Sequence, residues 1–305
     1  DDTEIVPVSI ARVAGEKVPM NLKWIQDPFC VLHGDTPTYL YNDDIGTWQW
    51  AVISALKNAA GAIARPTPLP LEGGNTRLAG NRWLLGRDLL LRYQDKGSVP
   101  GNIMAAQRCA EDLIRRFGSD LEPVWLGNKY LHAAPKWHPA ANLESLQPFF
   151  HLDLYVFPCG VNSKGQARIA VGSIPPSATD GREARLHQLL QGSLEMVVSD
   201  LQRAFLGEVE LLRIPLHILP HPEPPRLLSY CNGMWDGNAA LLPDYRSARL
   251  DPGPALEIER LQAQALASFR AHQIPVRFVP LNFFEDLSQY GALNCRVKII
   301  RYHQP

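Results

Sequence analysis

The chain has 305 residues, of which 46% are hydrophobic and 20% are charged. This length and composition are those of a globular protein with a buried core, and they exclude a disordered chain. The formal net charge of -1 gives no overall attraction to nucleic acid or to anionic lipid. No apolar run reaches the roughly 18 residues that a membrane span requires. We therefore expect neither nucleic acid nor a membrane as a partner.

The five cysteines are odd in number and widely spaced, without a C-x-x-C pair. This pattern predicts neither a disulfide framework nor a zinc site, so no metal ligands are expected. Free thiols suit a reducing compartment, which favours a cytoplasmic protein. The sequence begins with Asp1 rather than Met, so we expect the natural N-terminus to lie upstream, and secretion is the alternative. The cysteines are Cys30, Cys109, Cys159, Cys231 and Cys295.

Short strand-like runs alternate with four segments in which apolar residues have helical spacing. The order strand, strand, helix, strand recurs roughly every 50–70 residues. Gly207 directly after the third helical segment indicates a helix end. The predicted strands are 28–32, 83–85, 124–126, 152–157, 167–172, 209–216, 239–242, 276–280 and 297–302, and the predicted helices are 48–62, 103–117, 182–206 and 255–272.

This rhythm is not the alternation of a doubly wound sheet, and no G-x-G-x-x-G sequence follows a strand. The proline-rich segments 65–71 and 219–226 are expected to be loops between repeats, because proline removes a donor from a strand ladder. Neither segment is long enough to link domains. We predict one α/β domain over residues 1–305, built from repeated mixed units.

Cys295 lies ten residues from the end, in Gly291-Ala-Leu-Asn294-Cys295-Arg296, before an apolar strand-like run. A thiol between a loop and a strand can be exposed, and nearby positive charge would lower its pKa. Taken alone, Cys295 is better explained as an unreactive buried thiol than as a nucleophile, and Cys159 beside another turn shows that such settings are common. Cys295 becomes a candidate nucleophile only when it is considered together with the polar residues of the segments described below.

His151 and Asp153 stand two residues apart among apolar neighbours. Two-residue spacing places both side chains on one face of a predicted strand. Burial of either group without a hydrogen-bonding partner is unfavourable, so their presence among apolar residues requires an explanation. It is either a structural hydrogen-bonded pair or part of a catalytic site.

Two further segments carry polar residues at predicted turns. Glu72-Gly-Gly-Asn75 precedes a hairpin with Gly80-Asn81 as its turn, and paired glycines allow close backbone approach. Asp27 lies in Trp24-Ile-Gln-Asp27-Pro-Phe29, where Trp24 and Phe29 are either core residues or a wall that binds a cation. Each segment alone is also compatible with an ordinary turn.

In this order the segments resemble the guanidine-modifying enzymes of the pentein fold. These include arginine, agmatine and peptidyl-arginine deiminases, dimethylarginine dimethylaminohydrolases and amidinotransferases. The segment around Asp27 resembles their R-D-P-F or W-x-R-D motif, with Gln26 in place of arginine. Glu72 to Asn75 is similar to E-G-G-[DN], and His151 to Asp153 fits H-x-D. The resemblance covers residues 20–300 and implies a five-bladed pseudo-symmetric α/β propeller of ββαβ-type repeats.

The resemblance also implies the roles of the residues. Cys295 corresponds to the nucleophile, His151 to the acid and base, and Glu72 to the residue that orients the imidazole. Asp27 and Asp153 correspond to the carboxylates that bind the guanidinium. The expected substrate-lining residues are Trp24, Phe29, Asn75 and Asn294. No cofactor is implied by this chemistry.

The expected activity is that of a cysteine-dependent hydrolase of the deiminase type, which passes through a covalent thiouronium. An amidinotransferase and a non-catalytic binding protein of the same fold are the alternatives. A cysteine protease would leave Asp27 and Glu72 without a role. The partner is a small-molecule or peptidyl guanidino substrate, and a homo-oligomer is possible. The glycine-rich run that precedes the nucleophile in the family is reduced here to 291–294, which leaves the identity of the substrate open.

Overall fold

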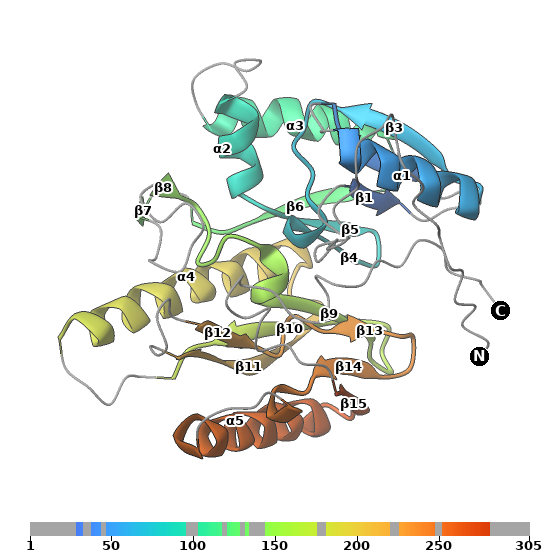
Figure 1. The fold of residues 1–305 in the computed structure, drawn as a ribbon. Helices are drawn as coiled ribbons and strands as arrows, with labels where there is room; N and C mark the ends of the chain where they lie inside the picture. Colours follow the sequence, from blue (N-terminus) through green and yellow to red (C-terminus); the bar gives the residue numbers. More distant parts are fainter. Residues whose placement is uncertain are drawn as a thin grey trace. The chain divides into compact units, whose positions relative to one another are not determined.

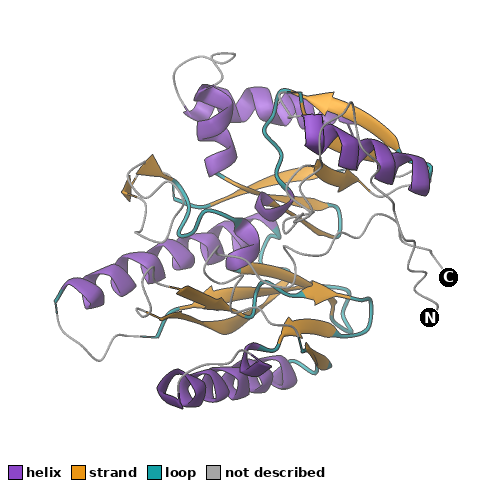
Figure 2. Cartoon of the chain, in the orientation of Figure 1, coloured by secondary structure: helices purple, strands orange, loops and turns teal. Residues whose placement is uncertain are grey.

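The computed structural model describes residues 29–32, 38–43, 47–95, 103–117, 121–128, 132–133, 144–175, 181–219, 226–247 and 252–280. These residues combine helices and strands, as predicted for an α/β protein (Figure 2). They belong to two compact units, which divide between Gly73 and Gly74. None of the helices in the described ranges is long and apolar enough to cross a membrane.

The described residues of the first unit form one three-stranded sheet and one α-helix. Strand β1 (Phe29–Leu32) pairs antiparallel with β2 (Thr38–Asn42), and β3 (Ile63–Thr67) joins β2 in parallel after helix α1 (Thr47–Ala60). The order ββαβ is therefore the predicted repeat. The ring centroids of Tyr41 on β2 and Trp50 on α1 are 5.2 Å apart, which fixes one contact between sheet and helix.

The second unit repeats this arrangement three times among its described residues. Its first sheet pairs β4 (Thr76–Ala79) antiparallel with β5 (Arg82–Gly86) and adds β6 (Glu122–Leu126) in parallel. Two helices, α2 (Asp88–Asp95) and α3 (Ile103–Phe117), lie between β5 and β6 in the sequence. Gly80 between β4 and β5 has a φ of +61°, which is the left-handed conformation that the predicted Gly80-Asn81 turn requires.

The next sheet follows the same order and gains a fourth strand. Strand β9 (Val156–Val161) pairs antiparallel with β10 (Ala167–Ser173), which pairs in parallel with β11 (Val209–Leu219) after helix α4 (Arg182–Ala204). Strand β12 (Arg226–Ser229) extends the sheet beyond β11. The chain leaves α4 through left-handed residues Leu206 and Gly207, and Gly207 N donates to Gln202 O. The predicted helix end at Gly207 is thus confirmed.

The remaining repeat consists of β13 (Met234–Trp235), β14 (Ala240–Pro243), helix α5 (Pro252–Ala271) and β15 (Val276–Val279). Strand β14 pairs antiparallel with β13 and parallel with β15. Figure 1 shows the four-stranded sheet of the preceding repeat between α4 and α5. The shorter elements are β7 (His132–Ala133), β8 (Glu144–Ser145), and the 3-10 helices η1 (Gly73–Asn75), η2 (Leu152–Leu154) and η3 (Tyr245–Ser247).

Some predicted element boundaries are wrong. The predicted strand 152–157 begins only at Val156, because η2 occupies its first half. The predicted loop 65–71 begins inside β3, and both β2 and α2 were not predicted. Among the described strands, β3 lies at the edge of its sheet, and a proline is tolerated at an edge because the missing N–H interrupts no second ladder. The predicted strand 297–302 lies outside the described residues.

The core of the second unit joins α4 to the segment that carries the H-x-D motif. Buried residues on α4 recur at three- and four-residue intervals, as one apolar helix face requires. They share a cluster with residues from β10 to β12 and with Phe149, Leu152 and Leu154, which flank His151. Each fully buried large apolar side chain contributes about 1.5–3 kcal/mol. The α4 members are Leu190, Leu194, Val197 and Leu201.

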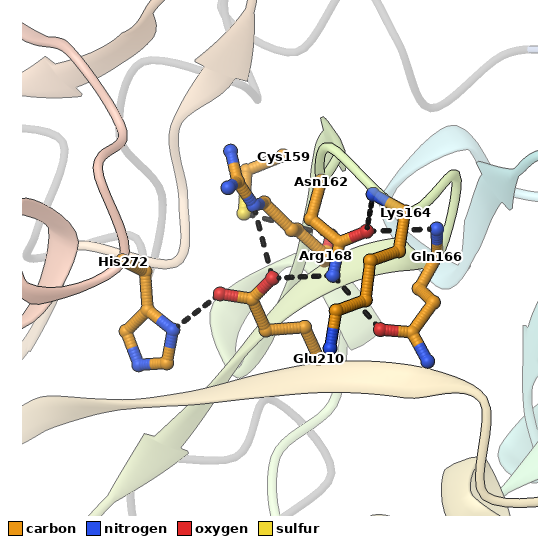
Figure 3. Close-up of polar contacts among 7 residues, drawn as sticks. All are labelled: Cys159, Asn162, Lys164, Gln166, Arg168, Glu210 and His272. Carbon is orange, nitrogen blue, oxygen red and sulfur yellow. Dashed lines mark hydrogen bonds and ion pairs between the residues drawn. The ribbon is translucent and has the colours of Figure 1, made fainter.

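A polar cluster around Glu210 links β9, β10 and β11 to the end of α5 (Figure 3). The Glu210 carboxylate contacts His272 Nδ1 at 2.6 Å and Arg168 Nε at 3.2 Å, and it accepts a hydrogen bond from Asn162 Nδ2 at 2.8 Å. Burial acts to raise the pKa of Glu210, but these three partners outweigh it and lower the pKa. The cluster therefore connects the sheet to the end of α5 through contacts whose strength depends on the charge of Glu210.

Candidate active site

The second glycine of the Glu72 to Asn75 segment lies directly against the His151 imidazole. A Cβ atom on Gly74 would lie 2.3 Å from His151 Nδ1 and 2.8 Å from Cγ. Gly74 does not have a left-handed φ, so close approach explains this glycine and backbone conformation does not. The absence of a side chain at residue 74 lets the imidazole reach its place.

Asn75 holds the backbone on both sides of His151. Its side chain is fully buried. Nδ2 donates to Phe150 O at 3.1 Å, and Oδ1 accepts from Leu152 N at 3.1 Å. A single amide thus fixes the carbonyl before the histidine and the N–H after it. Because Asn75 directly follows Gly74, the same short turn determines the position of the His151 imidazole and of the backbone on either side of it.

A second buried amide extends this network to helix α2. Gln147 Nε2 donates to Asn75 Oδ1 at 3.0 Å, and Gln147 Oε1 accepts from Asp88 N at 2.7 Å. The Asp88 carboxylate in turn accepts from Ser145 Oγ at 2.7 Å and from Leu146 N at 2.6 Å. Buried polar groups stabilise a structure only when they are paired, and these groups pair with one another. Asp88, Ser145 and Gln147 were not predicted from the sequence, because their pairing depends on contacts between residues 57 or more positions apart.

His151 is extended, with φ -126° and ψ 141°, and it directly precedes η2. It is 8% exposed, and its ring centroid lies 4.4 Å from that of Phe150. Asp153 is the middle residue of η2 and is fully buried. The prediction that both side chains project from one face of a strand is therefore wrong. The pair instead spans the entry into a 3-10 turn, which changes the backbone direction between the two residues.

Three side chains from other elements contact the Asp153 segment. Arg77 on β4 forms an ion pair with Asp153, with 3.4 Å between Nη2 and Oδ2. Asn232 Nδ2 donates to Asp153 O at 3.5 Å, and Ser229 Oγ donates to Leu154 O at 2.6 Å. The turn that carries Asp153 is therefore bound to the start of the second unit, to the last residue of β12 and to the chain just after that strand. The Asp153 carboxylate is held in position because the backbone that carries it is hydrogen-bonded to Asn232 and Ser229.

The other predicted site residues are placed only in part. Glu72 is partly exposed and immediately precedes the boundary between the two units. Phe29 is the first residue of β1, and its side chain lies outside the described residues. Trp24, Asp27, Asn294 and Cys295 also lie outside them. The structure thus brings Asn75, His151 and Asp153 together within the second unit.

The side chains of three of the five cysteines are described. Cys159 and Cys231 are buried, whereas Cys109 is exposed on α3. Burial raises the pKa of Cys159 to about 12 and also raises the pKa of Cys231. These two thiols stay protonated at neutral pH, which makes them poor nucleophiles. Within the described ranges, no group of three or more His, Cys, Asp or Glu residues is arranged to hold a metal ion.

No protein-family model and no curated protein matches the sequence. Solved structures do match. The agmatine deiminase of C. jejuni is similar with a TM-score of 0.61 and 17% identity, over 95% of this chain and 75% of that enzyme. The agmatine deiminase of Enterococcus faecalis is similar with a TM-score of 0.53 and 13% identity, over 90% of this chain and 73% of that enzyme. SxtG, an amidinotransferase of Microseira wollei from the saxitoxin pathway, is similar with a TM-score of 0.52 and 13% identity, over 92% of this chain and 70% of SxtG.

This chain has the fold of guanidine-modifying enzymes. The resemblance predicted from the ordered motifs is thereby confirmed at the level of fold. At 17% identity or less the likeness says nothing of individual residues, so the chemistry must be argued from the site itself.

Proposed function

We propose that this protein is a cysteine-dependent hydrolase that acts on the guanidinium group of an arginine-like substrate. The observation that carries the proposal is the fully buried Asp153 carboxylate, which already holds a guanidinium, that of Arg77, at 3.4 Å. A second supporting observation is the imidazole of His151 two residues away, seated against Gly74 by close packing. Both groups lie on a segment that a buried network holds in place.

In the proposed reaction, Asp27 and Asp153 accept hydrogen bonds from the substrate N–H groups and align the central carbon. The Cys295 thiolate attacks this carbon and forms a C–S bond, which gives a tetrahedral adduct. The C–N bond to the leaving amine then breaks as His151 donates a proton to that nitrogen. A covalent thiouronium remains on Cys295. Glu72 accepts a hydrogen bond from the imidazole and favours its charged form.

Hydrolysis completes the cycle. His151 takes a proton from a water molecule, whose oxygen attacks the thiouronium carbon. The second tetrahedral adduct collapses, the C–S bond breaks, and the product leaves with a carbonyl in place of one nitrogen. The thiolate of Cys295 is regenerated. No step needs an oxidant, a reductant or a second substrate other than water.

The similarity to agmatine deiminases favours hydrolysis of a small guanidino compound. One of these structures is a cysteine-to-serine variant of the C. jejuni enzyme with substrate bound. The second candidate is an amidinotransferase, which the similarity to SxtG favours. Its covalent half is the same, but an amine takes the place of water. We propose the same residues for both reactions.

We further propose that residues 1–305 form one catalytic domain with five ββαβ-type repeats around a pseudo-symmetry axis. Four such repeats are present among the described residues. The fifth would then come from residues outside the described ranges. The predicted strand 297–302 is one candidate element for it.

The proposal is tested with a panel that contains arginine, agmatine, methylated arginines and peptidyl arginine. Ammonia or amine release and carbonyl product are measured, with and without glycine or a diamine as acceptor. Cys295→Ala should lower turnover by about 10³-fold or more, since it removes the nucleophile. Cys109→Ala, which changes an exposed thiol on α3, is the matched control and should retain full activity. Turnover by the Cys295 variant at the wild-type rate would refute the proposed mechanism.

A further inference from the structure

Arg77 presents to Asp153 the same chemical group that the proposed substrate carries. It lies on β4, two residues after Asn75, and its side chain is 13% exposed. Its Nη2 atom is 3.4 Å from Asp153 Oδ2. Arg77 was not predicted as a site residue, because nothing local to β4 indicates a partner 76 residues away.

Electrostatics explains why a guanidinium occupies this place. The Asp153 side chain is fully buried, and a buried carboxylate without positive charge nearby is strongly disfavoured. In the proposed reaction the substrate supplies that positive charge. Without substrate the protein itself must supply it, and Arg77 does.

The geometry of the pair shows that it is not a tight structural fork. Strong arginine–carboxylate pairs usually make two parallel bonds of about 2.7–2.9 Å. Here the close approach is between one nitrogen and one oxygen, at 3.4 Å. The other terminal nitrogen, Nη1, donates to the carbonyl of the neighbouring Thr76 at 3.3 Å. Arg77 is therefore divided between two weak contacts, and it can release Asp153 at modest cost.

We propose that Arg77 is an internal competitor for the guanidinium site, which pairs with Asp153 in the free protein and is displaced by the substrate guanidinium. This inference rests on the proposed function. Arg77 is then a residue that sets affinity: it lowers the population of molecules in which Asp153 can accept a substrate. If Arg77 occupies Asp153 in about nine of ten molecules, it raises the apparent Kd about tenfold.

The test measures ligand binding by titration calorimetry in a Cys295→Ser background, where turnover is blocked. The probes are L-arginine and agmatine. Arg77→Met keeps the apolar length of the side chain and removes the charge, so we expect binding about tenfold tighter. Arg77→Lys keeps a positive charge but cannot form the forked contact of an arginine. Its Kd should therefore fall between that of the protein with Arg77 and that of the Arg77→Met variant. If the Arg77→Met variant is too unstable to measure, the Arg77→Lys comparison decides alone.

Arg82→Met is the matched control. Arg82 lies in the same hairpin on β5, opposite Ala79 in the register, and its guanidinium pairs with Glu122. Its removal should leave Kd unchanged. Equal or weaker binding by both Arg77 variants, with wild-type binding measurable, would overturn the inference and leave the proposed function standing. Absence of binding to either probe in every variant, together with no turnover of any compound in the guanidine panel, would overturn both. Tighter binding without turnover of any guanidino compound by the protein with Cys295 intact would support the competitor role and reject the hydrolase.

Discussion

Gly74→Ala is the sharpest test of the site geometry, because it adds one methyl group directly against the His151 ring. The new Cβ would lie 2.3 Å from Nδ1, 2.8 Å from Cγ and 2.9 Å from Cε1. Ordinary contact begins near 3.4 Å. The ring or the turn must therefore move by about 1 Å, and the ring cannot bend away because it is 8% exposed and packed against Phe150.

Two magnitudes follow from this shift. Overpacking of this kind costs about 1–3 kcal/mol of unfolding free energy. A displacement of about 1 Å in a catalytic group lowers the rate on the order of 10²-fold. The loss should appear in kcat more than in KM, since His151 acts on the proton and does not bind the substrate in the proposed mechanism. The three atoms nearest to the added methyl group all belong to His151, and none belongs to Asp153, which is proposed to bind the substrate.

The assay combines urea unfolding with turnover on the best compound of the guanidine panel. Gly192→Ala is the matched control: Gly192 is exposed on α4, and a Cβ there meets nothing within 4 Å. That change should stabilise the protein by roughly 0.5–1 kcal/mol, because alanine favours the helix. A Gly74→Ala protein with wild-type stability would refute the packing argument, and a destabilised Gly74→Ala protein with wild-type kcat would contradict the role of His151.

Two further predictions concern the surrounding networks. Asn75→Ala removes the partners of Phe150 O and Leu152 N and should cost at least about 2 kcal/mol in urea unfolding, whereas Asn81→Ala in the exposed turn should cost little; equal stability of the two variants would contradict the clamp. The pKa of Glu210 is lowered in the folded protein, so its contribution to stability is present above the usual glutamate pKa and is lost as pH falls through the lowered value. The stability difference between wild type and Glu210→Gln, measured at about pH 7 and again at about pH 3, should therefore shrink at the lower pH; a difference independent of pH would refute this.

Much of the fold was predictable because the signals are local. The helix 103–117 coincides with α3, and Gly80-Asn81 and Gly207 form the predicted turn and helix end. Apolar spacing and glycine conformation depend on a few neighbouring residues, so they can be read from one segment. The strand, strand, helix, strand order follows from these local signals.

The missed elements have signals that are weak or that depend on partners. Helix α2 has eight residues, too few to establish a helical period. Strand β3 carries Pro66, which a sequence reading counts against a strand, although an edge position accepts it. The 3-10 turn η2 lies in an apolar run that is equally compatible with a strand.

For the candidate site, the sequence by itself determined the order of the candidate residues: Asp27, Glu72, His151, Asp153 and Cys295, taken in that order, predicted the fold of guanidine-modifying enzymes, and the structure has that fold. Only the tertiary structure decided what surrounds His151 and Asp153. Gly74, Asn75 and Arg77 reach that segment across about 75 residues of sequence, through close packing and buried hydrogen bonds. Such contacts depend on how the sheets and the core bring distant segments together, and no local pattern records them.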